Sequence, residues 1–584
     1  MGKKSSEKKN RKVEPHVEQH QKKPHVQPVV HTNIPPIEKK KLEIPFQKIA
    51  GVFLAVVILL TLFIVGATLL RKAFSAVPLA EILPAEKTAA LFEINTNPDH
   101  TQLVQAKNIL AKSNYSFEKT LKAIEDKFEV NFETDIKPWL GRNVGIAEII
   151  PDPAVGNLAT VYFVEAFSKK GAENFIQKIK GLEKTGAGIY KFELKKSKEI
   201  IFVSFLEEYL MISSSEAAIK SLTLTGSQSL KKLSESEEYA RAKENLPLNK
   251  IANLFVDFEK APEKLLQKYG LLDESSILTS MIRPFVNLFS AESFWLMAGS
   301  ENFIVKSYSN LKSSYLKGNG YLTHKDQYTP DLTAYIPDDV MVFWGGQDLE
   351  KQTKRMVEVL GQGGESVGTV FEEVLGNYTE KYFGNTVSLE EDIYPLVTNE
   401  FALGVTKKND KNLYTLVLEL KNPAEDALRL QKLANNFISA GAVFEPRVEE
   451  HELPDGTKTR EIVASPSEII KSEIPCKDKV INAMETPDGK WGIYYVATNS
   501  IAILSTDKEA IRKSLSLEEG ESVKSLKNSS IYATHILPMA GNSDEVSYFD
   551  ISKLWPASNL VKSLSTGKEY FSDGVMTHYF IYVE

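Results

Sequence analysis

Few residues in this sequence of 584 residues have a spacing that could do chemistry. Ser116 and Lys119 match the Ser-x-x-Lys pattern of some acylating enzymes. The chain is rich in both residue types, and the segment better fits the start of a helix. The stretch GQGGESVG at 361–368 is glycine-rich, but it follows a helical pattern, whereas a phosphate-binding loop follows a strand. Both patterns therefore favour local structure over catalysis.

Metal chemistry has equally little support in the sequence. His16 and His20 are four residues apart, with His25 and His31 nearby, and a helical segment would let them bind a transition metal weakly. The segment is charged and interrupted by proline, so we expect solvated histidines there. The other histidines are not paired at ligand spacing: His100, His324, His451, His535 and His578. The single cysteine, Cys476, excludes an intramolecular disulfide and a cysteine cluster.

We therefore predict no metal site, no cofactor and no catalytic residue, and we expect a protein that is not an enzyme. The zinc-protease, Walker A, nucleophile-elbow and EF-hand motifs are all missing from the sequence. Carboxylates are numerous, and an acid/base pair among them stays open because only geometry identifies one.

One short motif occurs twice, as DIKPWLG at 135–141 and as DIYPLVT at 392–398. The shared Asp and Pro suit backbone roles: Asp accepts a hydrogen bond at a helix N-cap or in an Asx-turn, and Pro fixes φ in a first turn. We predict a structural corner that points Ile136 and Ile393 into the core. Trp139 occurs only in the first copy, so it is our candidate for contact with a partner.

The N-terminal part has the pattern of a membrane anchor. Residues 49–70 hold no charge and no proline, and as a helix they would span about 33 Å, enough to cross a bilayer. A cleaved signal peptide is the alternative, with AFSA at 73–76 as the cleavage site, but the apolar run is too long and its leader too large. Residues 1–48 carry a net charge of +7, which predicts a disordered cytoplasmic tail and an extracytoplasmic remainder. The basic residues expected at the membrane surface are Lys39, Lys40, Lys41, Lys48, Arg71 and Lys72.

The remainder is acidic, with a net charge of −16 over residues 73–584, so we expect it to bind no nucleic acid. It also reads as an internal duplication. Pro84 and Pro337 begin similar strands at an offset of 253, and Asp257 and Asp550 end similar strands at an offset of 293. Growth of the offset along the chain indicates an insertion in the second copy, near 440–492.

The expected fold class is α+β, with two duplicated lobes that have largely antiparallel sheets and helices on one face. After the tail and the anchor, we predict a linker over 71–81, a first repeat over 82–312, a linker over 313–333 and a second repeat over 334–584. In the insertion, HELPDGTKTREIV predicts a hairpin with its turn at Pro454 to Thr457.

Several of these segments also resemble a known family: LPAEKTAALFEINTNPDHTQ after the apolar run, DIKPWLGRNVGIAE, ATVYFVEAFSKKGAENFIQKI and YLMISSSEAAIKSL. They are similar to the bacterial envelope family known only as domain of unknown function 3352. The second copy departs from the pattern at Leu396 and Val397. The resemblance implies a membrane-anchored extracytoplasmic protein and brings no catalytic residues.

The expected function is a non-catalytic binding or scaffold module of the cell envelope, anchored through 49–70, whose partner is an envelope protein or a cell-wall component. The alternative is an enzyme that processes envelope polymers, which demands a cleft with convergent titratable groups. A surface adhesin is a minor alternative.

Overall fold

The computed structural model describes residues 77–583, with short breaks and with longer gaps within 113–130, 261–287, 313–327, 355–382 and 440–468. Contacts divide the chain into Met1–Gln47 and Lys48–Glu584, and every described residue belongs to the second unit. The predicted anchor, 49–70, lies outside the described residues. Within the part that the structure describes, no helix is long and apolar enough to cross a membrane.

The first half of the described chain forms ten strands. They are β1 (Thr88–Asn95), β2 (Leu140–Ile149), β3 (Ala159–Ala166), β4 (Glu183–Gly186), β5 (Ile189–Glu193), β6 (Ile200–Leu206), β7 (Tyr209–Ser213), β8 (Ala252–Asp257), β9 (Phe289–Ala298) and β10 (Asn302–Leu311). All pair antiparallel, in the spatial order β4-β5-β6-β7-β3-β2-β1-β8-β9-β10. The strand β10 therefore ends this half of the sheet.

The second half has the same strand order. Its strands are β11 (Val342–Gln347), β12 (Glu400–Lys408), β13 (Lys411–Glu419), β16 (Ile470–Cys476), β17 (Lys479–Glu485), β18 (Gly492–Ala497), β19 (Ile501–Ser505), β20 (Glu545–Asp550), β21 (Val561–Tyr570) and β22 (Gly574–Val583). Their order is β16-β17-β18-β19-β13-β12-β11-β20-β21-β22. Each strand of the first half thus has a counterpart at the same place in the second.

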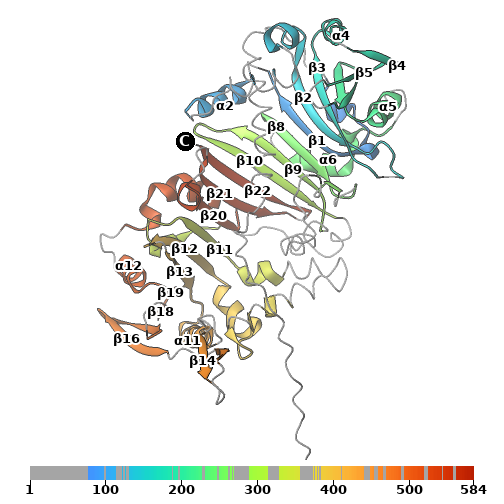
Figure 1. Ribbon diagram of the computed structural model, residues 1–584. Coiled ribbons are helices and arrows are strands. Elements are labelled where there is room, and N and C mark those ends of the chain that lie inside the picture. The colour runs from blue at the N-terminus through green and yellow to red at the C-terminus, as the bar shows by residue number, and fades with distance from the viewer. Residues whose placement is uncertain are drawn as a thin grey trace, which may run out of the picture. The chain divides into compact units, whose positions relative to one another are not determined.

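The two halves join where β10 pairs antiparallel with β22, a contact that we call the seam (Figure 1). Lys306 lies opposite His578, and the flanking pairs place Val305 opposite Tyr579 and Ser307 opposite Thr577. Lys306 and His578 occupy equivalent positions, because each is also the neighbour of an equivalent residue on β9 or β21. An approximate two-fold axis therefore passes through the Lys306 and His578 pair.

The seam makes the expected fold class wrong, because twenty strands form one continuous antiparallel sheet rather than the sheets of two lobes. The physical reason is that β10 and β22 would each leave an unpaired row of N–H and C=O groups at a sheet edge. Pairing the two edges satisfies both rows. A pattern of alternating residues shows that a strand exists, but it does not show which strand lies beside it.

The helices are α2 (Thr101–Lys112), α4 (Lys169–Gln177), α5 (Glu216–Thr225), α6 (Glu237–Asn245), α11 (Pro423–Ser439), α12 (Lys508–Glu518), α13 (Leu537–Ala540) and α14 (Ile551–Leu554). They cover both faces, which also corrects the expectation of helices on one face. One face, the α6 face, carries Ile219 of α5, Ala242 of α6 and Ile511 of α12 against the sheet. The opposite face, the α4 face, carries Ile176 of α4 and Leu430 of α11.

Short turns precede several strands: η2 (Leu79–Glu81), η3 (Ala85–Lys87), η4 (Phe132–Ile136), η5 (Leu233–Glu235), η6 (Asp331–Tyr335), η7 (Leu389–Ile393), η8 (Tyr394–Val397), η9 (Leu526–Asn528) and η10 (Tyr532–Ile536). The repeated motif lies at η4 and η7. Asp135 Oδ2 accepts from the N–H of Asn131 at 2.9 Å, and Asp392 Oδ2 accepts from the N–H of Ser388 at 2.8 Å. The N-cap is the residue four positions before each Asp. The Asp lies within the turn, and its side chain bonds back to the N–H of the N-cap residue.

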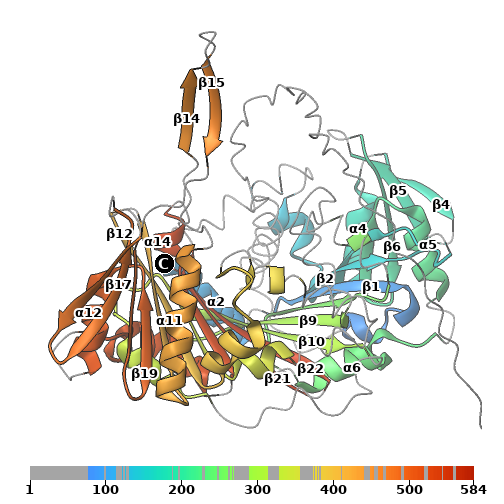
Figure 2. The same ribbon diagram turned by 90° about the horizontal axis from the view of Figure 1, so that it is seen from below.

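The second half carries a separate two-stranded ribbon, β14 (Arg447–Glu452) and β15 (Lys458–Val463), which projects from the sheet in Figure 2. Its strands flank the expected hairpin turn, and the turn residues lie outside the described residues. The ribbon has no strand counterpart in the described first half.

We predict that Gly574→Ala destabilises the protein through the seam. A Cβ at this position would lie 2.6 Å from the carbonyl oxygen of Ser309 and 2.8 Å from the ring of Tyr308, both on β10. Overpacking of this kind costs about 1–3 kcal/mol, measurable by thermal or urea unfolding of the purified protein. Gly541→Ala is the matched control, since its Cβ would meet nothing within 4 Å. Equal stability of the two variants would contradict a tightly packed seam.

Candidate functional site

A pocket of about 210 Å³ opens on the first half of the chain, between η2, α6 and the strands β1, β8 and β9. Its walls combine charged, polar and aromatic side chains: Pro78, Ala80, Glu81, Glu93, Ile94, Asn95, His100, Asn143, Ser234, Tyr239, Lys243, Lys250, Ile251, Asn253 and Trp295. The floor is a row of residues that cross-strand register places side by side on the α6 face. Glu93 of β1 lies opposite Asn253 of β8, and Asn253 lies opposite Trp295 of β9.

Glu93 fastens the turn that precedes the first strand. Its Oε1 accepts from the N–H of Leu79 in η2 at 2.8 Å, and its Oε2 accepts from Asn253 Nδ2 at 3.4 Å. Leu79 in turn covers Gly145, where a Cβ would lie 2.2 Å from the leucine Cδ1. Burial raises the pKa of Glu93, against the opposing effects of the Leu79 bond, the Lys250 charge and the Asn253 bond. Both carboxylate oxygens are thus already engaged within the protein.

Lys250 is the cation of the pocket. Its Nζ lies 3.9 Å from the centre of the Trp295 ring, and Trp295 is only 4% exposed. Burial lowers the pKa of Lys250 to about 8, the charge of Glu93 raises it in part, and the like charge of Lys243 lowers it further. Within the described residues, no carboxylate lies within 4 Å of the Lys250 ammonium. The ammonium therefore rests on an aromatic face rather than in an ion pair.

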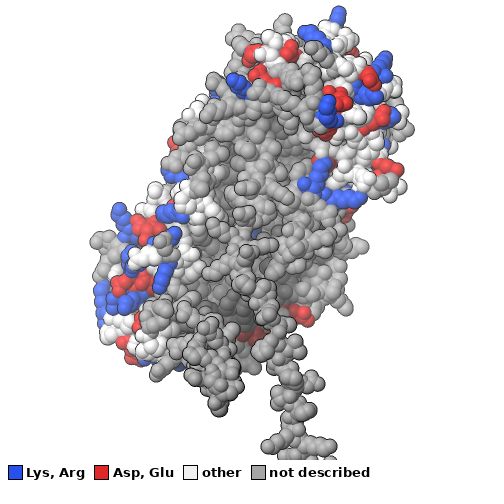
Figure 3. Space-filling view, in the orientation of Figure 1, with Lys and Arg blue, Asp and Glu red and all other residues white. Residues whose placement is uncertain are grey.

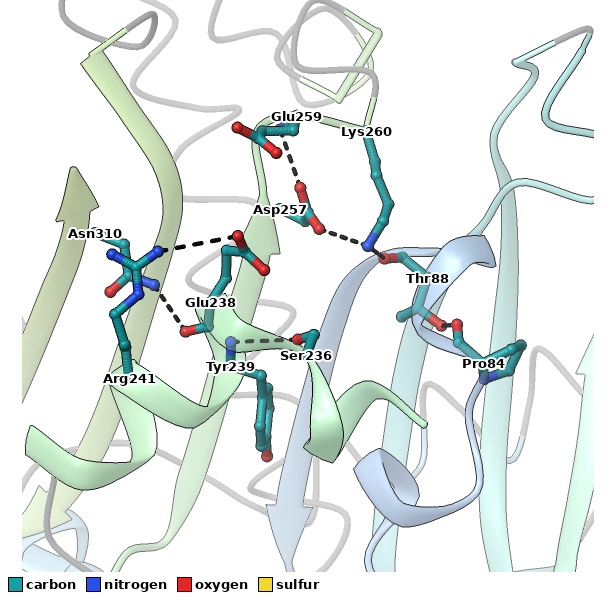
Figure 4. Close-up of polar contacts among 10 residues, drawn as sticks. All are labelled: Pro84, Thr88, Ser236, Glu238, Tyr239, Arg241, Asp257, Glu259, Lys260 and Asn310. Atoms are coloured by element: carbon teal, nitrogen blue, oxygen red, sulfur yellow. Dashed lines mark hydrogen bonds and ion pairs between the residues drawn. The ribbon is translucent and has the colours of Figure 1, made fainter. Parts of the chain in front are cut away.

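The helix α6 supplies Tyr239 to the pocket, and two hydrogen bonds hold the first turn of this helix in place (Figure 4). Ser236 Oγ accepts from the N–H of Tyr239 at 3.3 Å, which caps the start of the helix. Asn310 Nδ2 donates to the carbonyl oxygen of Glu238 at 2.7 Å and ties the helix to β10. The Tyr239 ring packs edge-on against Phe255, 5.2 Å away between ring centres, and burial raises the pKa of Tyr239.

Two more polar groups of the pocket wall lack a partner within the described part of the chain. They are Nδ1 of His100 and Oγ of Ser234, and both atoms are buried. Burial lowers the pKa of His100, which favours its neutral ring. Buried polar atoms without a protein partner are uncommon, and water or a ligand usually satisfies them. Both side chains line the pocket, but these two atoms have almost no accessible surface, so a bound molecule reaches them only if the wall moves.

The second half has the same fold in this region, but other residues stand at the positions that form the floor of the pocket. Its registers place Gly345, Val546 and Gly567 where the first half has Glu93, Asn253 and Trp295. The space above these small residues is filled. A Cβ on Gly345 would lie 2.5 Å from the Tyr328 hydroxyl oxygen, and one on Gly567 would lie 2.4 Å from Ser543 Oγ.

In the second half, a glutamate on a different strand makes the hydrogen bond that Glu93 makes to the first turn. Glu400 of β12 accepts from the N–H of Leu332 at 2.9 Å, and Leu332 in η6 corresponds to Leu79 in η2. Burial raises the pKa of Glu400 to about 8. A carboxyl that fastens the first turn is therefore common to both halves, whereas the group formed by Lys250, Asn253 and Trp295 belongs to the first half only.

The structure places Trp139, our candidate partner contact, in the interior. It is 4% exposed, its Nε1 donates to the carbonyl oxygen of Asp135 at 2.6 Å, and its ring lies 5.5 Å from that of Phe175 in α4. Little of this side chain is left for a partner to touch. The expected membrane-surface residues all lie outside the described residues: Lys39, Lys40, Lys41, Lys48, Arg71 and Lys72.

Sequence reasoning missed Glu93, Lys250 and Trp295. One signal was present, because Asn253 and Val546 are aligned by the repeat, and the same offset of 293 aligns Lys250 with Ser543. Among the described residues, no group of three His, Cys, Asp or Glu side chains is arranged to hold a metal ion. The absence of metal, cofactor and catalysis stays a prediction.

Comparisons with known proteins are few. A family model described as "Protein of unknown function (DUF3352)" matches residues 48–572. No curated protein matches the chain. Two solved structures, crystal forms III and I of TP0453, are similar at 12% and 13% sequence identity, each with a TM-score of 0.24, and the match covers 41% of this chain and 81% of that chain. A TM-score of this size supports no conclusion about fold or function.

We predict that Glu400 makes stability fall as pH rises. Its pKa is raised from 4.5 to about 8 in the folded protein, so between these values the folded state binds the extra proton. The loss is at most about 1.4 kcal/mol per pH unit. Glu400→Gln keeps an acceptor for Leu332 and removes the titration, so urea unfolding at pH 5 and pH 8 should show a smaller difference for the variant. An identical pH dependence in the variant and the parent protein would contradict the raised pKa.

Proposed function

Because the chain belongs to the DUF3352 family of proteins of unknown function, we propose from its own residues that it is a single-pass membrane-anchored, extracytoplasmic binding protein without catalytic activity. The pocket of the first half is its ligand site. The observation that carries this proposal is the difference between the halves: the same ten-strand order occurs twice, and among the described residues the second copy has side chains filling the space where the first has the polar pocket.

The second half serves as an internal control for the role of the pocket. It folds with Gly345, Ser543 and Val546 at the equivalent positions, so the fold does not require a charged group there. A desolvated lysine and unpartnered polar atoms lower stability unless something binds them. Unpartnered buried polar atoms occur in both halves, whereas the lysine at position 250 has serine as its equivalent, as expected where a ligand uses the lysine.

Binding explains the geometry better than catalysis does. A general acid or base needs an oxygen or nitrogen that can reach the substrate, and both oxygens of Glu93 are engaged by Leu79 and Asn253. His100 has no carboxylate partner to orient it within the described residues, as a catalytic histidine usually has. The alternative of an enzyme acting on envelope polymers therefore has weaker support.

The anchor rests on sequence. The apolar run 49–70 and the basic tail before it support an orientation with the large C-terminal part outside the cytoplasm. On the described surface visible in Figure 3, Lys and Arg side chains are interspersed with Asp and Glu. Such a mixture suits neither nucleic acid nor a broad acidic partner.

We predict that Glu473→Cys, in a Cys476→Ala background, reacts with a membrane-impermeant maleimide in intact cells. Residue 473 is exposed on the edge strand β16 and would be the single cysteine of the chain. Deletion of 49–70 should move the protein from the membrane fraction to the soluble fraction. The single-cysteine protein without this deletion must label after lysis as a control. Labelling only after lysis would contradict the proposed orientation.

We predict that Lys250→Ser with Asn253→Val abolishes ligand binding, since the second half has Ser543 and Val546 at these positions. Circular dichroism checks that the variant is folded, because Asn253→Val removes the bond to Glu93. Ligand-observed NMR with a small-molecule extract of the cell envelope measures binding as line broadening. Thr333→Ser, a change inside the second half away from the pocket, is the matched control. If the double variant and the parent protein broaden the same ligand signals, the pocket is not the binding site.

A further inference from the structure

Among the described residues, the Lys250 ammonium has no carboxylate in contact with it, and the charge of Glu93 acts on it from farther away. Buried charges in proteins are normally paired, and the contact of this ammonium is the Trp295 ring at 3.9 Å. Within the described residues, no carboxylate lies within ion-pair distance of it. Its equivalent in the second half is Ser543, which packs over Gly567 and carries no charge.

A second lysine of the wall, Lys243, is exposed and adds positive charge beside the pocket. Lys243, on the last turn of α6, lines the same pocket and is close enough for its like charge to disfavour the protonated form of Lys250. Within the described residues Lys243 also has no ion pair. Two unpaired ammonium groups beside one cavity repel each other, and an anion between them removes the repulsion.

The acidic groups of the wall do not fill this role. Glu93 uses Oε1 for Leu79 and Oε2 for Asn253, and its charge acts on Lys250 from beyond ion-pair distance. Glu81 lies more than 4 Å from both lysines, because no ion pair joins them within the described residues. A ligand anion can therefore approach the lysines without displacing an internal salt bridge.

We propose that the pocket binds its ligand through an anionic group, a carboxylate or a phosphate, held between Lys250 and Lys243, with the rest of the molecule against the other residues of the pocket wall. This inference rests on the proposed function, since it names the ligand class of the same pocket. A volume of about 210 Å³ is below the usual ligand pocket of roughly 300–1,000 Å³. The ligand is accordingly a small acid, or the acidic end group of a larger envelope molecule.

The test uses acetate and inorganic phosphate as probes and acetamide as the neutral counterpart of acetate, with binding measured by calorimetry at pH 7. We expect one or both anions to bind and acetamide to bind at least roughly tenfold more weakly. Which anion binds more tightly decides between carboxylate and phosphate. Binding should weaken above pH 8, since Lys250 loses its proton there.

Three variants make the test specific. Lys250→Met should weaken anion binding about tenfold or more, and Lys250→Arg, which keeps the charge, should stay within a few-fold of the parent protein. Lys508→Met is the control, because it removes the same charge from an exposed site on α12 far along the chain from the pocket. Circular dichroism checks that each variant is folded.

Two results overturn the proposal: anion binding that is unchanged in Lys250→Met, or the absence of binding of both anions at 50 mM, a concentration far above the roughly 1 mM range of weak specific ligands. The experiments distinguish failure of the anionic ligand class from failure of the pocket as the binding site. If envelope ligands still lose binding in the double variant at Lys250 and Asn253 while both anions fail, the pocket remains the site and only the ligand class falls.

Discussion

The pairing of β10 with β22 is the contact on which the rest of the structure depends. Without it, each half would end in a ten-residue strand with one row of unpaired backbone groups, a template for aggregation. With it, twenty strands become one sheet whose approximate two-fold axis runs through Lys306 and His578. Helix α2 of the first half also packs near Val583 of β22, so side chains reinforce the backbone pairing.

The two halves share the same strand order, but residues at equivalent positions can differ between them. The first turn of each half must be fastened to the sheet, and both halves do so with a buried glutamate that accepts from a leucine N–H. The glutamate comes from β1 in one half and from β12 in the other, so the constraint acts on the carboxylate's place in space rather than on one sequence position. Lys250 and Trp295 take no part in fastening the turn, and their equivalents in the second half are Ser543 and Gly567. The asymmetry of the pocket supports the binding role that we propose.

The sequence predicts some of this well and some of it poorly. Alternating residues and the repeated segments identify strands such as β8 and β20, because strand periodicity is local. The seam could not be predicted, since pairing of β10 with β22 joins residues more than 250 positions apart and any exposed strand edge could have formed it. The corner at Asp135 and Asp392 is a backbone turn, as its residue types indicate, although each Asp closes the turn from its fourth position instead of capping it. Trp139 stood out by being unique to one copy, yet uniqueness does not distinguish a buried aromatic residue from an exposed one.

The pocket was hidden for a different reason. Glu93, Asn253 and Trp295 come from three strands, and only their register brings them into one row. The central claim is that Lys250 is a desolvated cation that binds an anionic ligand. The pKa of Lys250, measured by titration, tests this claim most directly. NMR of the ¹³C-methylated lysine side chains measures the pKa of Lys250 with and without the bound anion. We predict a pKa of about 8 in the unbound protein that rises on binding, whereas an ordinary value near 10.5, or one that the anion leaves unchanged, would contradict the account.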